Sequence, residues 1–231
     1  MGAVKHFFKS FTLFEYLLWG CSVAAILLSF FLCGNTDYLN LFGSILGATA
    51  LIFVAKGKIV GQILCVFFAA YYGFVSFFMR YYGEMLTYLC MSAPMAIAAV
   101  VSWVRHPSKW DKTEVAVGSP PLRDYLLIFA AAIIVTIGFF FILRALDTAN
   151  LWWSTASVTT SFIAVMLTQR RSPFYALAYA ANDIVLIILW SLAAATNKEY
   201  IALVVCFCVF LANDSYGFVN WLKMRKRQVS Q

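Results

Sequence analysis

The segment FYALAYAANDIVLIILWSLAAATNKEY, residues 174–200, has the pattern of one long apolar helix with an amide and a carboxylate, Asn182 and Asp183, in its middle. It belongs to a chain in which hydrophobic residues make up 63% and charged residues only 12%. A soluble domain carries about 25% charged residues. We therefore expect lipid to surround most of this chain, and the polar pair to face something other than lipid.

Eight apolar stretches come close to the roughly 20 residues that a helix needs to cross a bilayer. They are residues 14–33, 41–55, 59–79, 85–104, 124–146, 151–168, 174–195 and 200–222. Two tight basic turns, KGK at 56–58 and RRSP at 170–173, separate the second span from the third and the sixth from the seventh. The sequence thus predicts an all-α integral membrane protein with eight transmembrane helices.

The basic residues alternate between the two sides of this arrangement. One side holds 14 of the 17 Lys and Arg residues, among them Lys5 and Lys9. The other side holds Arg80, Arg144 and Lys198. By the positive-inside rule, both termini and the connection 105–123 are cytoplasmic. The basic charge then reflects topology and affinity for anionic lipid, so we do not expect nucleic acid as a partner.

The topology also implies an internal repeat. After the first span come three spans, one span and three spans. Because the single span returns the chain across the bilayer, the two triplets run parallel, as in transporters whose halves are related by an axis along the membrane normal. The predicted units are an N-terminal tail and extra helix (1–36), a first three-helix repeat (37–105), a cytoplasmic loop and linker helix (106–147), a second three-helix repeat (148–222) and a basic cytoplasmic tail (223–231).

A second polar pair, Asn213-Asp214, lies in the last span. It and the pair at Asn182 each stand about nine residues from the basic end of their helix, roughly 13 Å at 1.5 Å per residue. The sixth span adds hydroxyl groups at the same level, including Ser157 and Thr160. Polar groups inside a bilayer usually face a cavity or a partner, which favours a ligand site near the midplane. The alternative is that these groups only pack one helix against another.

Aromatic residues accompany the first polar pair. Tyr175 and Tyr179 share a helix face with Asn182, seven and three residues away. An aromatic face beside hydrogen-bonding groups suits a flat, polar ring. Aromatic residues also make up 18% of the chain, and we expect Trp103 and Trp221 in the interfacial belts.

The spans lack the residues of several enzyme and cofactor classes. Both histidines, His6 and His106, lie outside the spans, which excludes an intramembrane serine hydrolase or metal site. No Lys lies within a span to hold retinal, and the six cysteines match no disulfide framework. We predict no catalytic residue, no metal, no cofactor and no enzymatic activity.

The stretch LWWSTASVTTSFIAVMLTQRRSPFYALAYAAND, residues 151–183, resembles the start of the second repeat of the PnuC vitamin transporters. The matching positions are Trp152, Ser154, Thr160, Arg170, Tyr175 and Asn182. The stretch NDSYGFVNWLKMRKRQ, residues 213–228, resembles the end of that family, with Tyr216 followed by a basic tail. The resemblance implies a three-plus-one-plus-three plan shared with the SWEET sugar transporters.

The resemblance also implies a function, which is uptake of nicotinamide riboside, a vitamin B3 precursor of NAD, across a bacterial inner membrane. The substrate equilibrates by facilitated diffusion, and a cytoplasmic kinase phosphorylates it so that it cannot leave. Its pyridinium cation suits aromatic rings and a carboxylate, and its amide and hydroxyls suit Asn and Thr. The candidate substrate-binding residues are Trp152, Ser157, Thr160, Tyr175, Tyr179, Asn182, Asp183, Asn213, Tyr216 and Tyr88.

Two other functions stay open. One is a proton-coupled carrier of another vitamin, nucleoside or sugar, in which Asp183 or Asp214 takes up the proton. The other is a membrane scaffold that transports nothing. The sequence also leaves open whether the protein forms a homo-oligomer. It does not tell how much the first triplet contributes to the site, because Phe68 takes the position in the first repeat that Asn182 takes in the second.

Overall fold

The computed structural model describes residues 11–78 and 85–230. Within these residues the chain is helical, and β-type pairing is limited to two isolated bridges beside the loop at 106–121. Four residues named above, Lys5, His6, Lys9 and Arg80, lie outside the described residues.

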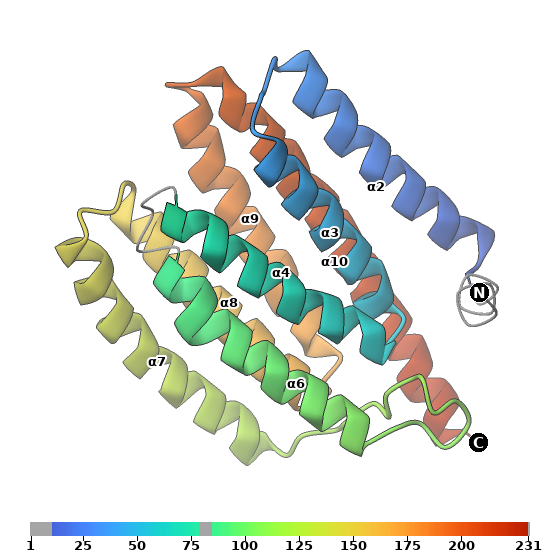
Figure 1. The fold of residues 1–231 in the computed structure, drawn as a ribbon. Coiled ribbons are helices and arrows are strands. Elements are labelled where there is room, and N and C mark those ends of the chain that lie inside the picture. The colour runs from blue at the N-terminus through green and yellow to red at the C-terminus, as the bar shows by residue number, and fades with distance from the viewer. Residues whose placement is uncertain (1–10, 79–84, 231) are drawn as a thin grey trace.

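In the described part, eight helices are long and apolar enough to cross a membrane (Figure 1). Six are single helices: α2 (Leu13–Leu32), α3 (Tyr38–Ala55), α4 (Ile59–Phe78), α7 (Leu122–Ala145), α8 (Leu151–Gln169) and α9 (Phe174–Ala194). The fourth span joins a π-helical turn, η1 (Thr87–Ser92), to α6 (Ala93–Arg105), and the eighth joins a short 3₁₀ turn, η2 (Lys198–Tyr200), to α10 (Ile201–Val229). The prediction of eight spans is confirmed. The basic segment that follows residue 222 continues the last helix as far as Val229.

The local sequence explains how several helices begin and end. Thr12 and Glu15 form a capping box at the start of α2. The KGK and RRSP turns close α3 and α8 in the same way. Gly57 and Arg171 take positive φ angles of 65° and 57°, and the next residue donates its N–H to the carbonyl five positions earlier, at 2.9 and 3.0 Å.

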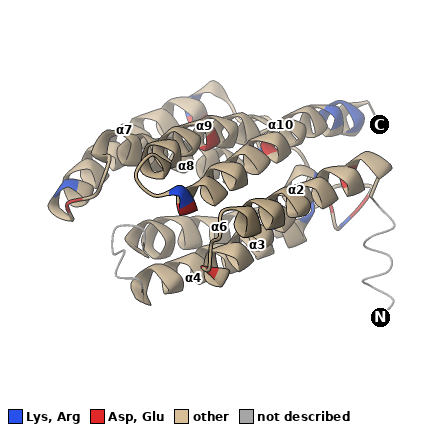
Figure 2. Ribbon diagram, turned by 90° about the horizontal axis from the view of Figure 1, so that it is seen from above, with Lys and Arg blue, Asp and Glu red and all other residues tan. Residues whose placement is uncertain are grey.

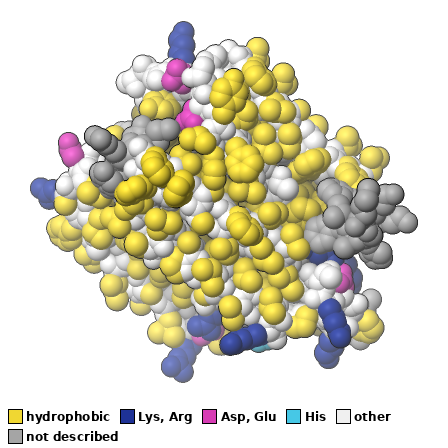
Figure 3. All heavy atoms as spheres, viewed as in Figure 1, with side chains coloured by type: hydrophobic (Ala, Val, Ile, Leu, Met, Phe, Trp, Pro, Cys, Tyr) yellow, Lys and Arg dark blue, Asp and Glu magenta, His cyan; other side chains and the backbone are white. Residues whose placement is uncertain are grey.

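The outer surface of the bundle is apolar. On α7, Leu126, Ile133, Ile134 and Phe141 are all more than 60% exposed. Figure 3 shows hydrophobic side chains across the middle of one face, with most Lys and Arg along one edge. We call this edge the basic end; it carries the α3–α4 and α8–α9 turns, the 106–121 loop and the C-terminal part of α10. An apolar surface of this extent is stable only in lipid.

Six helices form a closed ring in which each helix contacts the next. The order around the ring is α3, α4, α6, α8, α9, α10 and back to α3. Outside the ring, α2 lies against α3 and α10, and α7 lies against α8 (Figures 1 and 2). The ring brings α8, α9 and α10, which carry the predicted polar residues, into direct contact.

Two tryptophans connect the two triplets at the basic end. Trp103 on α6 donates from Nε1 to the carbonyl of Thr168 near the end of α8, at 3.0 Å. Trp221 on α10 donates to the carbonyl of Val54 near the end of α3, at 2.9 Å. Both side chains are fully buried and their rings are 5.3 Å apart. The prediction that they lie in the interfacial belts is wrong, because both side chains are enclosed between helices. Their N–H groups there satisfy buried carbonyls at two helix ends, which would otherwise lack donors.

In a second pair of hydrogen bonds, each triplet again donates to a carbonyl of the other. Ser102 donates to the carbonyl of Gln169 at 2.6 Å, and Asn220 donates to the carbonyl of Ala55 at 2.9 Å. Each donor directly precedes one of the two tryptophans, and each acceptor directly follows the carbonyl that the tryptophan uses. The α3–α4–α6 and α8–α9–α10 triplets thus contact each other through equivalent bonds.

Helix α2 is fixed to both helices that it covers. Trp19 donates to Thr49 on α3 at 3.2 Å. Glu15, which is buried, accepts from Lys56 at the end of α3 at 2.6 Å and from the hydroxyl of Tyr216 on α10 at 2.7 Å. The contact between α3 and α10 is therefore also held from outside the ring.

Candidate functional site

Asn182 lies between α9 and α8 and is 6% exposed. Its Oδ1 accepts hydrogen bonds from the hydroxyls of Thr160 at 2.8 Å and Ser157 at 3.1 Å. Its side-chain nitrogen donates no hydrogen bond within the described part of the chain, so two N–H donors remain for a ligand. The predicted grouping of Asn182 with the hydroxyls of α8 is thus present in the structure.

The carboxyl groups of Asp183 on α9 and Asp214 on α10 are neighbours, close enough to interact electrostatically. Both side chains are buried, at 3% and 4% exposed, and neither forms an ion pair with a described Lys or Arg. Oδ2 of Asp183 is buried and has no hydrogen-bond partner among the described residues. Uncompensated carboxylates are costly in an apolar interior, so this pair favours a cation or a shared proton.

Tyr175 and Tyr179 occupy successive turns of α9 between the basic end and the carboxyl pair. Tyr175 is fully buried, donates to the carbonyl of Val54 at 3.3 Å and packs 4.8 Å from the Trp221 ring. It therefore belongs to the contact between the two triplets. Tyr179 lies one turn further in, with its ring 6.2 Å from that of Tyr175, and is the member of this pair closer to Asn182 along the helix.

A second aromatic group comes from the first triplet. Tyr88 stacks on Tyr72 with ring centres 5.4 Å apart and planes 25° apart, and Phe68 packs 4.8 Å from the Tyr72 ring. Tyr88 lies in the π-helical turn η1, which ends just before Pro94. Proline has no N–H to give to the preceding turn, which explains the irregularity, and π-helical turns often mark functional positions.

The smooth face of α3 makes room for these rings. A Cβ atom at Gly43 would lie 2.4 Å from the Tyr72 ring. One at Gly47 would lie 2.6 Å from the Phe210 ring and 2.8 Å from the Phe68 ring. Glycines four residues apart are a common close-packing pattern in membrane helices. Here they allow aromatic rings of α4 and α10 to approach the α3 backbone.

Besides Tyr175, three predicted site residues lie elsewhere. Trp152 is 76% exposed and packs against Phe140 of α7. Tyr216 is bonded to Glu15 of α2, as described above. Asn213 is fully buried and donates to Ser22 of α2 at 3.0 Å. Neighbouring residues on a helix project about 100° apart, so Asn213 and Asp214 face different helices.

Some polar residues of the interior were missing from the predicted set. Asp214 takes the place expected for its neighbour Asn213. Gln62 on α4 is 4% exposed, and Cys65, three residues further on the same face, lies within electrostatic reach of Asp214. A single amide within an apolar span was the available signal for Gln62.

The fold and this interior define the class of the protein. Eight apolar helices with an amide, hydroxyls, paired carboxyls and aromatic rings between facing helices are the features of a multi-pass membrane protein with an intramembrane polar site, as in transporters of small molecules.

Comparison with known proteins identifies the family. The family model described as nicotinamide mononucleotide transporter matches residues 37–223, and the chain belongs to this family, whose curated relatives are named PnuC. It is therefore a transporter, as the resemblance implied.

Three relatives resemble this chain over most of its length. A nicotinamide riboside transporter PnuC from Neisseria mucosa is 28% identical over 98% of this chain and 88% of its own length. One from Haemophilus influenzae is 24% identical over 83% and 82%. The crystal structure of the vitamin B3 transporter PnuC superposes with a TM-score of 0.79 and 26% identity, covering 95% of this chain and 94% of that one.

Proposed function

We propose that this chain carries nicotinamide riboside across the membrane through a site at the middle of the helix ring. The observation that carries this proposal is the buried Asp183–Asp214 carboxyl pair, which lacks a basic partner among the described residues. The riboside supplies a permanent pyridinium cation. The names of the relatives point to the same substrate.

The charge of the site separates the riboside from the mononucleotide in the family description. The mononucleotide adds a phosphate, which makes its net charge negative. The six ring helices carry Lys or Arg only at their basic ends, so the interior offers a phosphate two carboxyl groups and no cation. Like charges repel strongly where water is excluded. The site therefore favours the riboside.

The remaining groups suit the rest of the molecule. The N–H donors of Asn182, with the hydroxyls of Ser157 and Thr160, suit the carboxamide and ribose oxygens. The rings of Tyr179 and Tyr88 suit the flat pyridinium, since a cation over a tyrosine face gains about 0.5–2 kcal/mol.

We further propose that the two triplets are parallel repeats that rock around this site, in the three-plus-one-plus-three plan. The reciprocal hydrogen bonds of Trp103 and Trp221 support this arrangement. The two αL turns at Gly57 and Arg171 support it as well. In this proposal the basic end is cytoplasmic, by the positive-inside rule, and the membrane is the bacterial inner membrane. Rocking alone gives facilitated diffusion, and a cytoplasmic kinase drives accumulation by trapping the product.

A proton-coupled carrier is the second candidate, and the closeness of the Asp183 and Asp214 carboxyl groups favours it. A pair of this kind can hold one proton between its members, and release of that proton on one side of the membrane would couple transport to a gradient.

Calorimetric titration of the purified protein tests the substrate. Nicotinamide riboside should bind most tightly, with nicotinamide, thiamine and nicotinamide mononucleotide all weaker. Uncharged nicotinamide lacks both the cation and the ribose, and the mononucleotide carries the repelled phosphate. Tighter binding of the mononucleotide than of the riboside would contradict the charge argument, and no heat with any of the four would favour a scaffold.

A further inference from the structure

The 106–121 loop between α6 and α7 lies across the basic end and is bonded to both triplets. Its first attachment is to the α3–α4 turn. Val115 donates its N–H to the carbonyl of Gly57 at 2.9 Å, and Ile59 donates to the carbonyl of Thr113 at 3.3 Å. The loop thus adds a short β-type pairing to the turn that ends the first helix of the first triplet.

An ion pair between a buried lysine and a half-exposed aspartate reinforces this attachment. Lys58 is only 8% exposed, and its Nζ lies 2.5 Å from Oδ2 of Asp111 and 2.8 Å from the hydroxyl of Thr113. Burial alone would raise the pKa of Asp111, but the hydrogen bonds from Lys58 and Thr113 lower this pKa to about 2. The carboxylate is therefore charged throughout the physiological pH range, and the attachment does not switch with pH.

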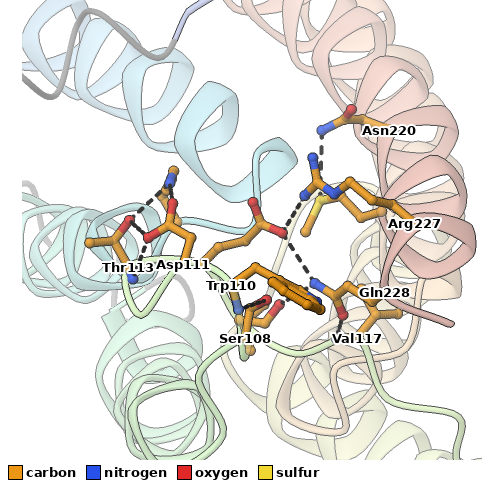
Figure 4. Close-up of polar contacts among 12 residues, drawn as sticks. Ser108, Trp110, Asp111, Thr113, Val117, Asn220, Arg227 and Gln228 are labelled. Atoms are coloured by element: carbon orange, nitrogen blue, oxygen red, sulfur yellow. Dashed lines mark hydrogen bonds and ion pairs between the residues drawn. The ribbon is translucent and has the colours of Figure 1, made fainter. Parts of the chain in front are cut away.

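The second attachment is to the end of α10, in the other triplet. Oε1 of Glu114 accepts from Arg227 at 2.6 Å and from Gln228 at 3.1 Å. Gln228 in turn accepts from the N–H of Val117 at 2.8 Å and donates to the carbonyl of Val115 at 3.2 Å. Figure 4 shows Asp111 and Thr113 on one side of the loop, and Arg227 and Gln228 on the other.

A third attachment joins the loop to the α8–α9 turn. Gly118 donates its N–H to the carbonyl of Arg171 at 2.9 Å. A Cβ at Gly118 would lie 2.5 Å from the carbonyl oxygen of Arg170, so only glycine allows this approach. All three attachments lie at the basic end, beyond the buried pair Trp103 and Trp221.

The side chains of the second attachment border open space. A cavity of about 350 Å³ is lined by Ser108, Trp110, Asp111, Glu114 and Arg227. The side chain of Arg227 is 54% exposed, whereas that of Glu114 is 11% exposed. Arg227 can therefore leave Glu114 by rotating into the cavity or into water. Asp111 of the first attachment is 44% exposed and borders the same cavity, so exposure does not separate the two ion pairs. The attachment to the α3–α4 turn also has two backbone hydrogen bonds. The attachment to α10 uses only side chains of α10, and it is therefore the weaker of these two.

We infer that the 106–121 loop is a latch that holds the basic end closed, and that its attachment to α10 at Glu114, Arg227 and Gln228 must open before substrate can leave at this end. The loop stays with the first triplet through Lys58 and moves away from α10. This inference rests on the proposed transport cycle and adds to it the contact that controls opening at one end.

A reversible crosslink tests whether the attachment must open. In a background without the six native cysteines, Glu114→Cys and Gln228→Cys place two thiols across it. Because the native side chains meet only at their tips, a direct disulfide would be too short. A bifunctional methanethiosulfonate joins the two thiols through a spacer by reducible disulfides. After crosslinking, uptake of nicotinamide riboside into liposomes should fall by about tenfold or more, because a carrier that cannot open one end cannot complete its cycle. Reduction should restore it. Binding at the other end should persist in the crosslinked protein, which a merely unfolded variant would not show.

The matched control is the pair Tyr125→Cys and Ser172→Cys, whose native hydroxyls are 3.0 Å apart at the same end but join α7 to the α8–α9 turn. Joined by the same reagent, it should transport normally. The latch is wrong if fully crosslinked Glu114→Cys/Gln228→Cys protein transports at the rate it shows after reduction, or if the crosslinked control loses transport to the same extent.

A second measurement needs no substrate, so it separates failure of the latch from failure of the proposed substrate. In Glu114→Gln and Arg227→Gln proteins with native cysteines, a membrane-impermeant maleimide applied at the basic end should label Cys65 faster than in the parent. Cys65 lies on α4, toward the basic end, whereas Cys206 is buried near the other end of α10. Labelling of Cys206 should not change. Equal gains at both cysteines would indicate general loosening and would overturn the latch. Absence of riboside uptake in the reduced protein would instead reject the substrate.

Discussion

At the residue scale, one turn of α9 serves two different neighbours. Asn182 faces the hydroxyls of α8, and Asp183 faces the carboxyl of Asp214 on α10. Because successive residues project about 100° apart, a pair of adjacent polar residues can serve two sides of one helix. Substitutions at neighbouring positions should therefore have separate effects.

Asn182→Leu should weaken binding of nicotinamide riboside by roughly 5- to 150-fold. Leaving a buried ligand group without its hydrogen-bond partner costs about 1–3 kcal/mol, at 1.4 kcal/mol per tenfold. The fold and expression should survive, since Leu is well accepted in a membrane helix. Titration measures the change. The control is Ile184→Leu on the half-exposed side of the same helix. Binding as tight as in the parent would make Asn182 a packing residue only.

Substitutions at the two members of the second Asn-Asp pair should have different effects, one on ligand binding and the other on stability. Asp214→Asn should weaken riboside binding by roughly 30-fold or more, since breaking a buried charge contact costs about 2–5 kcal/mol. Asn213→Leu should leave Kd unchanged within about threefold but lower Tm, because Ser22 of α2 loses its partner. Titration and thermal unfolding in detergent measure the two effects. The opposite division would show that Asn213, and not its neighbour, faces the ligand.

At the element scale, the size of the residues on a helix face matches the side chains that pack against it. The Gly43–Gly47 face of α3 is flat because the rings of Phe68, Tyr72 and Phe210 lie against it. The glycines reduce the intrinsic stability of the helix, and ring contacts offset that loss.

Gly47→Ala should destabilise the protein by about 1–3 kcal/mol, the usual effect of an overpacked contact. Phe68 and Phe210 would both have to move, since the added Cβ would approach them to 2.8 and 2.6 Å. Thermal unfolding measures the change. Gly138→Ala on α7 is the matched control, because nothing lies within 4 Å of its Cβ position. It should be neutral or slightly stabilising, since alanine is the better helix former. A neutral Gly47→Ala would mean that these rings do not depend on the flat face.

The ion pair within the latch should show a defined pH dependence. The folded pKa of Asp111 is about 2, below its ordinary value of 3.8. Its contribution to stability is therefore complete above about pH 4 and disappears as the pH falls through about 2. Asp111→Asn should lower Tm equally at pH 7 and pH 5, and less at pH 3. A difference that had already vanished at pH 5 would show that the pair does not hold this loop.

The spans were predictable because their signal is composition over about 20 residues, which lipid enforces along the whole chain. The grouping of Asn182 with Ser157 and Thr160 was predictable from depth and helical spacing. The rotation of α10 was not, because this helix is apolar on nearly every side and the order Asn213-Asp214 does not indicate which residue faces inward. The positions of Trp103 and Trp221 also depend on contacts between segments far apart in the sequence.

At the scale of the whole molecule, the two proposed repeats meet at two seams, α3 with α10 and α6 with α8. Each seam has one tryptophan and one further side chain bonded to a carbonyl of the other triplet. Such a symmetric pair of contacts lets two units tilt relative to each other without either being distorted.

If this motion alone drives transport, nicotinamide riboside should equilibrate across liposome membranes without a proton gradient. The internal concentration should rise to the external one and stop, and a protonophore should change neither the rate nor the end level. Uptake of labelled riboside measures both. Accumulation above the external level that a protonophore abolishes would instead favour proton coupling through Asp183 and Asp214.

The position of α2 makes the two seams mechanically unequal. To part α3 from α10, the molecule would also have to tear α2 away from one of them, at Trp19, at Ser22 or at the buried Glu15. The seam between α6 and α8 has no such bridging helix, since α7 lies mainly on α8. Two halves of equal construction are therefore joined by one stiffer and one softer contact, and the difference in stiffness is set by a helix outside the ring.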